Sequence, residues 1–326
     1  MHDLSTHLTS VRDAVCLLQA GVLSTRARRS SARVGAALVY HRVGGEGSDS
    51  TREILPGLPR SVFAHQLRHF GRYYRVVKAS QLLEAVRARE RGDRFPLAIT
   101  FDDDLASHVR EALPALQSAG LPATFFLGGT SHPFWWQDLQ EAVDTRLVDS
   151  LPHVPHEDMR HALAREPKAI FRVAATIEGL TREQREETAA ALRAAAGTRS
   201  ANDNLRSIDV ATLVRAGNEI GFHTLRHEAL PTLADGELAA ALRDGRDELV
   251  AVTGAALAVI SYPHGKADDR VAQAARAAGY THGFTTARST VTPDADPLLL
   301  PRLPIALTAG KTALRLARAV ASSAAQ

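Results

Sequence analysis

Short apolar runs alternate along the chain with stretches in which apolar residues recur at helical spacing. The runs are typical of buried strands and the spaced stretches of amphipathic helices. Among the predicted helices are 61–74, 80–91 and 108–120, the last of which ends at a glycine. The predicted strands are 34–42, 75–79, 96–103, 122–128, 218–224, 257–263, 281–286 and 298–307. Buried strands that alternate with helices favour a parallel sheet, so the pattern predicts an α/β fold with a closed or nearly closed barrel.

One segment breaks this alternation. From about residue 131 to residue 207 there is no convincing strand, only charged helical stretches such as 181–197. The aromatic cluster "PFWWQDL" stands near its start. We predict a helical insertion over the mouth of the barrel, in which Trp135 and Trp136 either pack against the barrel or stack on a sugar ring.

The N-terminal residues 1–33 are predicted to form a helical segment, amphipathic over 11–23, followed by the basic linker "RARRSSAR"; the barrel would occupy 34–320. The helix suits a lid, or weak attachment to a membrane surface.

No run of eighteen apolar residues predicts a transmembrane helix. A single cysteine among 326 residues excludes an intrachain disulfide, and the positive charges follow the first apolar patch instead of preceding it, unlike a secretory signal. We expect a cytoplasmic protein, with peripheral attachment to the inner membrane face left open. A formal net charge of +3 with scattered arginines gives no reason to expect a nucleic-acid partner, and the sequence leaves the oligomeric state unknown.

Three consecutive carboxylates, Asp102 to Asp104, end the predicted strand 96–103. Like charges this close raise the cost of ionising one another, so either they face water or a positive group lies among them. His223 ends another predicted strand, and His227 follows four residues later. Two imidazoles and one carboxylate form a candidate facial triad that leaves positions on a divalent metal open for water and substrate.

Other polar residues also end predicted strands, namely His41 and the "YPHG" run at 262–265. In a parallel barrel the chemistry gathers at the carboxyl ends of the strands. Polar residues that end several different buried strands are difficult to explain by packing alone. The sequence therefore predicts one site at this end of the barrel.

Several stretches together resemble the polysaccharide deacetylases of the NodB-homology type, carbohydrate esterase family 4. The first is "TFDD" followed by "ALPALQSAGLPATFFL"; the next are "GNEIGFHTLRHEAL", which is similar to the family's H-[ST]-x-x-H motif, and "SYPHG". The later "AAGYTHGFTT" and "LPRLPI" resemble the same group, so the resemblance covers nearly the whole chain from about Val34 to Val320. It implies a distorted (β/α) barrel of the NodB-homology type.

The resemblance also implies roles for individual residues. Asp102 would be the general base, and the metal would be held by Asp103, His223 and His227. A metal lowers the pKa of a bound water toward neutrality, and an ionised carboxylate can then take the remaining proton. Zinc is the first choice for such a set, with Co²⁺, Ni²⁺ and Fe²⁺ as alternatives. Tyr262, Trp135 and Trp136 are expected to contact the sugar. A backbone N–H near Tyr262 is expected to help the metal hold the oxyanion.

The chain departs from the family pattern at three places. Asp104 stands where glycine is usual, which would bring an extra negative charge near the metal. Ser261 stands where an arginine often orients the base. The usual late histidine, the general acid, has no counterpart, so His41 and His264 are the candidate substitutes.

The sequence thus predicts a metal-dependent hydrolase that removes an N-acetyl group from an amino sugar of a bacterial glycan or glycan precursor, including a lipid-linked one. Two alternatives stay open. One is a catalytically inactive, carbohydrate-binding relative, which the departures favour. The other is a hydrolase of another small amide, such as a formamide, because pocket shape decides which acyl group is accepted.

Overall fold

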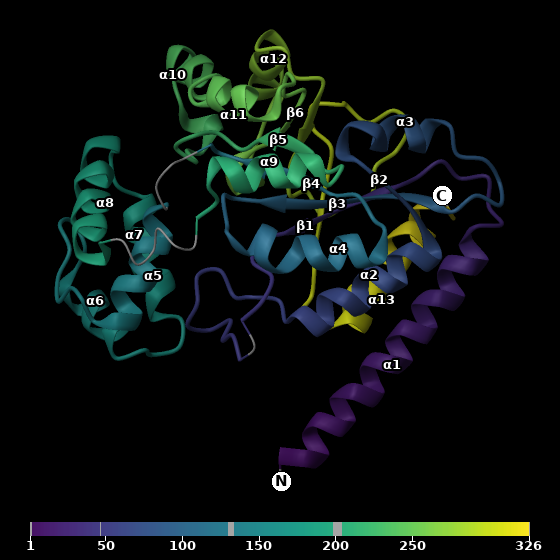
Figure 1. Cartoon of the computed structure of the whole chain (residues 1–326), viewed down its shortest axis with the longest axis horizontal. Coiled ribbons are helices and arrows are strands. Elements are labelled where there is room, and N and C mark those ends of the chain that lie inside the picture. The colour runs from purple at the N-terminus through teal and green to yellow at the C-terminus, as the bar shows by residue number, and fades with distance from the viewer. Residues whose placement is uncertain (1, 46, 130–133, 198–203, 326) are drawn as a thin grey trace.

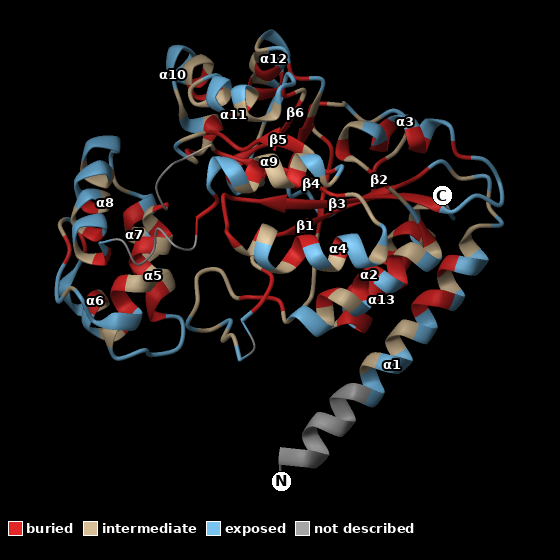
Figure 2. Ribbon diagram, in the orientation of Figure 1, coloured by how far each residue is buried: buried red, intermediate tan, exposed pale blue. Residues whose placement is uncertain are grey.

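The computed structural model describes residues 2–45, 47–129, 134–197 and 204–325, and its centre is one sheet of parallel strands (Figure 1). The order across the sheet is β7-β6-β5-β4-β3-β1-β8, and β2 lies beside the first half of β3. The strands are β1 Ala36–Tyr40, β2 Tyr74–Val77, β3 Phe95–Asp102, β4 Thr124–Leu127, β5 Glu219–Phe222, β6 Val259–Ser261, β7 His282–Phe284 and β8 Leu303–Pro304. Every residue of β1, β3 and β4 is buried, as the apolar runs predicted (Figure 2).

The two edges of the sheet meet through one C-terminal segment. Phe284 of β7 forms a parallel bridge with Leu300, and three residues later Leu303 of β8 pairs with Leu38 of β1. The sheet therefore curls into a distorted barrel, which confirms the predicted fold class. The strand predicted at 298–307 shrinks to two residues because Pro301 and Pro304 have no N–H to donate to a neighbouring strand.

Helices pack around the barrel and complete the repeating strand–helix pattern (Figure 1). A π-helical turn, His108–Ala112, leads into α4, which ends at Gly120 with φ 63°, the left-handed conformation that glycine adopts readily. The barrel helices are α2 Arg60–Tyr73, α3 Leu82–Arg87, α4 Leu113–Ala119, α9 Ser207–Arg215, α10 Asp235–Ala241, α11 Arg246–Thr253, α12 Asp269–Ala277 and α13 Ala309–Ser323.

Four helices between β4 and β5 form a separate group beyond the carboxyl ends of the strands (Figure 1). They are α5 Trp135–Thr145, α6 His156–Leu163, α7 Ala169–Glu178 and α8 Arg182–Ala196. Their apolar faces bury one another around residues such as Leu139, Met159, Val173 and Leu192. This group corresponds to the predicted insertion; parts of its predicted ends, 131–133 and 198–203, lie outside the described residues.

The N-terminal helix α1, His2–Ala27, extends beyond the amphipathic stretch 11–23 in both directions and packs its second half against α13. The predicted linker that follows is held in place, because the buried Arg89 guanidinium donates to the carbonyls of Arg28, Ser30 and Ala32. Within the described residues, no helix combines the length and apolar character that crossing a membrane requires.

Candidate active site

The residues predicted to carry chemistry come together at the carboxyl ends of the strands. Asp102 is the last residue of β3, His41 follows β1, and His223 follows β5. They line a cavity of about 310 Å³. The cavity lining also includes five other predicted site residues: Asp103, Trp135, Trp136, His227 and His264.

Asp103, His223 and His227 form a compact group of potential metal ligands, with one ligand atom from each within 4.8 Å of the others. Asp103 Oδ1 lies 3.6 Å from His223 Nε2 and 3.8 Å from His227 Nε2. The Nδ1–H of His223 donates to the Ser261 carbonyl over 2.8 Å. Because a carbonyl only accepts, this bond assigns the proton to Nδ1 and leaves the Nε2 lone pair directed toward the group.

The chemistry of these three residues fits a divalent cation. Asp103 Oδ1 is buried and has no hydrogen-bond partner among the residues that the structure describes. Burial, and then the neighbouring Asp102 and Asp104, raise the pKa of Asp103 well above its usual range, so this carboxylate lacks a positive counterpart. Burial lowers the pKa of His223 to about 4 and also lowers that of His227, which keeps both imidazoles in the neutral form that binds metals.

Several residues around the cavity hold an unusual backbone conformation. Asp103, Thr224, His227 and His264 have φ values of 72°, 61°, 51° and 56°. Non-glycine residues pay a steric penalty in this left-handed region, and such residues cluster at functional sites where the surrounding fold over-determines them. The strain thus accompanies the close approach of Asp103 and His227.

Asp102 is bound by Arg302, a residue that the sequence analysis did not single out. Arg302 is fully buried, and its two terminal nitrogens each donate to one Asp102 oxygen over 2.7 Å. Burial alone would raise the pKa of Asp102, but Arg302, and after it His223, outweigh that effect and hold the pKa below its usual range. Asp102 is therefore an ionised carboxylate directly beside the metal-ligand group.

Arg302 supplies the guanidinium that appeared to be missing at position 261. Ser261 Oγ accepts from Arg302 over 2.7 Å and lies 3.2 Å from Asp102 Oδ2. Thr100 and the Thr285 carbonyl accept further bonds from Arg302. The motif "LPRLPI" contained this arginine, but the spacing in sequence gave no sign that it would reach the carboxylate at the end of β3.

Asp104 does not point into the ligand group, although it lies close enough to raise the pKa of Asp103. Its side chain turns toward the end of β4, where it accepts the N–H groups of Gly128 over 2.8 Å and Gly129 over 3.1 Å. Burial raises the pKa of Asp104 to about 7, against the lowering effect of those two N–H groups. The left-handed φ in this turn belongs to Asp103, so position 104 has no need of glycine.

Tyr262 also differs from its predicted role as a sugar contact. Its side chain is fully buried, and its hydroxyl donates to the Leu298 carbonyl over 2.8 Å. Its backbone N–H donates to the Phe284 carbonyl across the sheet, so that N–H is not available to an oxyanion. Tyr262 supports the packing between β6 and the C-terminal segment and does not line the cavity.

The two tryptophans both line the cavity and pack within it. The Trp136 ring stacks on Phe134 at 4.3 Å and lies 4.6 Å from the His227 ring. Trp135 meets Trp136 edge to face and contacts the core of the insertion. Both alternatives considered for these residues, packing and a wall for substrate, are compatible with this position.

The candidate general acids occupy different parts of the cavity. The His264 ring lies 4.6 Å from the His227 ring, and its Nδ1 is 3.7 Å from Glu178 of the insertion. His41 lies near the Asp102–Arg302 pair, and burial lowers its pKa against the opposing effect of Asp102. Glu178 is a charged cavity residue that the sequence analysis missed, because only the packing of α7 over the barrel brings it there.

Comparisons with known proteins agree with this fold. A family model described as polysaccharide deacetylase matches residues 89–190 and 186–283. No curated protein matches the chain significantly. The chain is similar in structure to the deacetylase PplD of Streptococcus pyogenes in complex with acetate, with 16% identity and a TM-score of 0.59 over 88% of this chain and 98% of that chain.

Two further structures are similar at the level of the fold. IcaB from Ammonifex degensii shares 18% identity, with a TM-score of 0.53 over 89% of this chain and 98% of that chain. The putative polysaccharide deacetylase BA0330 from Bacillus anthracis shares 16% identity, with a TM-score of 0.55 over 88% of this chain and 69% of that chain.

Proposed function

We propose that this chain, which belongs to the polysaccharide deacetylase family, is a metal-dependent N-deacetylase of an amino sugar in a bacterial glycan or glycan precursor. One observation carries the proposal. A largely buried group of potential ligands, Asp103, His223 and His227, adjoins the ionised Asp102–Arg302 pair in a cavity of about 310 Å³. A binding module would need neither a positioned base nor an open set of ligands.

Asp103, His223 and His227 would hold the ion, with zinc as the first choice and Co²⁺, Ni²⁺ or Fe²⁺ as alternatives. When bound, such an ion polarises an acyl oxygen and makes water a stronger acid. The hydrogen bond from His223 to the Ser261 carbonyl fixes the ring so that its lone pair stays directed at the ion. The cation would also supply the positive counterpart that the buried Asp103 carboxylate lacks.

Asp102 would act as the general base. Its charge is secured by Arg302, so it is free to accept the proton of the attacking water at neutral pH. The water oxygen forms a bond to the acetamide carbon, the C–N bond then breaks, and the leaving nitrogen takes up a proton. The products are acetate and the free amine of the sugar.

The proton for the leaving nitrogen requires an acid on the cavity wall. His264 is the first candidate: burial lowers its pKa, and Glu178, 3.7 Å from its Nδ1, opposes that effect by favouring the protonated imidazole. His41 remains the second candidate, since it lines the same cavity beside Asp102. Trp135 and Trp136 would supply an apolar wall for the sugar.

The inactive, carbohydrate-binding alternative loses part of its basis. It depended on the extra charge of Asp104, the absent arginine and the absent late histidine. Arg302 supplies the guanidinium, and backbone N–H groups at the end of β4 bind the Asp104 side chain, whereas the late histidine still has no counterpart. Release of another acyl group, such as formate, is compatible with the same residues and is distinguished by the product that appears.

We further propose a cytoplasmic protein that attaches weakly to the inner membrane face and acts on a precursor such as a lipid-linked sugar. Support comes from α1, where Val11, Val15, Leu18 and Val22 are exposed along one side, with Leu18 at 71%. Arg12 and Arg26 are exposed on the same helix. Apolar residues flanked by cations are typical of helices that rest on anionic lipid.

The test combines metal analysis with acyl release. The purified protein is expected to hold one divalent ion and to release acetate from members of a panel of N-acetylated glycans. His227→Ala should lose the ion and the activity, while His65→Ala, an exposed histidine on α2, should keep both. A variant without all three ligand side chains that still binds one tight equivalent of zinc would show that the site is misassigned.

A further inference from the structure

A pocket of about 270 Å³ lies where the start of α5, one face of α8 and the turn that leads to His227 meet. Its charged lining residues are four arginines and two glutamates, namely Arg182, Arg185, Arg193, Arg226, Glu186 and Glu228. The other described residues of its lining are uncharged. In this arginine pocket the cations therefore outnumber the carboxylates.

Helix α8 gathers its positive charges on the side of the arginine pocket. All three arginines of the helix line the pocket. Their positions, together with that of Ala189, are three or four residues apart and so follow one helix face. Two of the three glutamates of α8, Glu183 and Glu187, are not part of the lining, and Glu187 lies 2.7 Å from His153 instead.

Two of the four arginines have acidic neighbours and stay accessible. Arg182 donates to Glu186 over 3.2 Å, and Arg226 pairs with an aspartate over 3.0 Å. The hydrogen bond to Glu186, and then the charge of Glu228, raise the pKa of Arg182, so both carboxylates of the lining act on this arginine. The side chains of Arg182 and Arg226 are 47% and 40% exposed, so a ligand can reach their guanidinium groups.

The other two cations, Arg185 and Arg193, have no carboxylate partner within the described part of the chain. Arg185 is half-buried and donates to the Leu180 carbonyl over 3.2 Å. Arg193 is exposed and lies further along the same face of α8. Two unbalanced guanidinium groups suit a ligand group with two negative charges. A phosphoryl group has about that charge at neutral pH, and its oxygens match the fork of guanidinium N–H donors.

The start of α5 adds to the positive potential of the arginine pocket. Its first residue, Trp135, and the preceding Phe134 both line the pocket. The N-terminal end of a helix favours an anion, because the dipoles of its peptide groups leave partial positive charge there. The helix end and the arginines therefore favour a ligand of the same sign.

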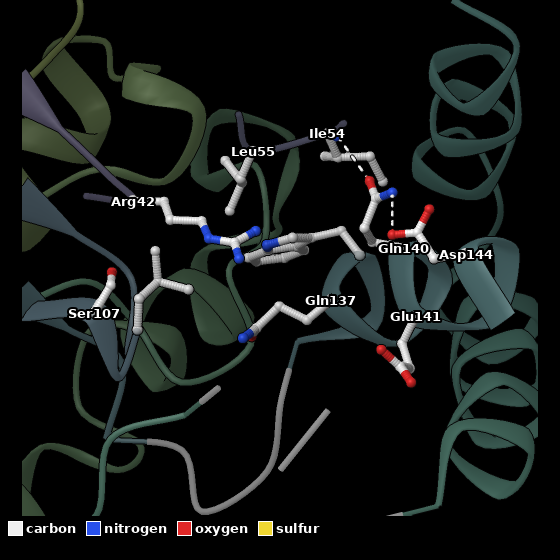
Figure 3. A pocket seen from close by; sticks show the side chains of 10 residues that line it. Arg42, Ile54, Leu55, Ser107, Gln137, Gln140, Glu141 and Asp144 are labelled. Carbon is white, nitrogen blue, oxygen red and sulfur yellow. Dashed lines mark hydrogen bonds between the residues drawn. The ribbon is translucent and has the colours of Figure 1, made fainter. Parts of the chain in front are cut away.

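A neighbouring pocket of about 190 Å³, between α5 and the barrel, has the opposite balance (Figure 3). One arginine and two carboxylates line it, namely Arg42, Glu141 and Asp144. An excess of arginine is thus not common to the hollows around α5, although arginines are scattered along the whole chain. It belongs to the pocket beside α8.

The arginine pocket borders the catalytic cavity. Trp135 lines both. Arg226 directly precedes the potential ligand His227, and Arg182 follows the cavity residue Glu178 by four positions. A charged group linked to a sugar in the cavity can therefore reach the arginines.

We propose that the arginine pocket binds a phosphoryl group attached to the amino sugar that is deacetylated. The inference rests on the proposed function and narrows its substrate, because it makes the substrate a phosphate- or diphosphate-linked sugar and not an uncharged polysaccharide. A lipid diphosphate and a nucleoside diphosphate both present this group beside the sugar. The phosphoryl group serves recognition and takes no part in breaking the amide bond.

Binding to metal-free protein tests the pocket without depending on activity, since no metal ion is then present to attract phosphate. Isothermal titration calorimetry compares N-acetylglucosamine and N-acetylgalactosamine with their 1-phosphates. One 1-phosphate should bind the parent at least about fivefold more tightly than the free sugar. Arg193→Gln should weaken that binding roughly three- to tenfold, whereas Arg193→Lys, which keeps the charge, should retain most of it. Arg160→Gln, at an exposed arginine of α6 outside the pocket, should change nothing.

Turnover by the metal-loaded protein identifies the carrier. Acetate release is compared between the free sugar, its uridine diphosphate derivative and the same sugar on a polyprenyl diphosphate in detergent micelles. The preferred carrier has the higher kcat/KM. Arg193→Gln should lower the ratio of kcat/KM for that carrier-linked sugar to kcat/KM for the free sugar roughly three- to tenfold.

Three results would overturn the proposal while acetate release still supports the deacetylase. They are 1-phosphates that bind no more tightly than the free sugars, a 1-phosphate affinity that Arg193→Gln leaves unchanged, and N-acetylmuramic acid, whose charge is a carboxylate, binding as tightly as the 1-phosphates. Conversely, a metal-loaded parent that binds a 1-phosphate through Arg193 and releases no acyl group from any of these sugars would support the arginine pocket and refute the proposed function.

Discussion

Replacing Arg302 with Met would remove the only cation that contacts the Asp102 carboxylate within the described residues. Both groups are buried, and the pair is joined by two bonds of 2.7 Å. Removing one partner of a buried ion pair leaves an uncompensated charge and typically costs about 3–5 kcal/mol. Arg302→Met should lower the free energy of unfolding by about that amount, and Asp102→Asn should also destabilise because it leaves the guanidinium alone.

The double variant distinguishes this pair from ordinary loss of packing. Asp102→Asn/Arg302→Met has neither charge. Its loss in free energy of unfolding should be smaller than the summed losses of the two single variants by at least about 2 kcal/mol. Arg89 provides a matched control, since it is another buried arginine whose bonds go to backbone carbonyls. Arg89→Met combined with Asp102→Asn should be additive within about 0.5 kcal/mol.

Urea unfolding followed by tryptophan fluorescence and circular dichroism measures these free energies, with a chelator present so that metal binding adds nothing to stability. The reasoning is refuted if Arg302→Met costs less than about 1 kcal/mol, or if its effect simply adds to that of Asp102→Asn. Either result would mean that the two side chains do not depend on each other in the folded protein.

Three further predictions follow from other parts of the molecule. Asp104→Gly should destabilise by about 1–3 kcal/mol and reduce activity, because it leaves the N–H groups of Gly128 and Gly129 without acceptors; an unchanged or raised activity would contradict this. Burial, and then Arg72, lower the pKa of His69 to about 4. As the pH falls below 6.5, this imidazole is therefore protonated in the unfolded chain before it is protonated in the folded protein, which lowers stability. Between pH 6.5 and 4 the free energy of unfolding of the parent should therefore fall by up to about 3 kcal/mol more than that of His69→Phe. Parallel plots of that free energy against pH for the two proteins would refute the assignment. Leu18→Ser should weaken co-sedimentation with anionic phosphatidylglycerol vesicles, whereas Ile208→Ser, another exposed apolar residue, should not; a loss of self-association without loss of vesicle binding would indicate a protein contact instead.

The sequence predicted those parts of the site that depend on local pattern. An apolar run ending in Asp102 and Asp103, and another ending in His223, come to lie at one edge of a parallel sheet because carboxyl ends share that edge; here only β4 separates the two strands. The four-residue step to His227 completes the group through a tight turn. These features required only the recognition of strands and their ends.

The parts that sequence missed depend on side-chain direction and distant packing. Arg302 reaches Asp102 across 200 residues, from a segment with prolines on either side that shows little strand pattern. Asp104 turns away because the N–H groups at the end of β4 need an acceptor, which a count of adjacent charges does not reveal. The burial of the Tyr262 ring depends on the close approach of the Leu298 carbonyl.

The central claim is that a metal ion and a separate carboxylate base act together in one cavity. Asp102→Asn tests it most directly, with metal content and acetate release measured on the same sample after circular dichroism shows the variant to be folded. The account predicts near-stoichiometric metal, because Asp103 and not Asp102 is the ligand, together with a rate roughly a hundred- to ten-thousand-fold below the parent. An Asp102→Asn protein as active as the parent, or a folded one that has lost its metal, would contradict it.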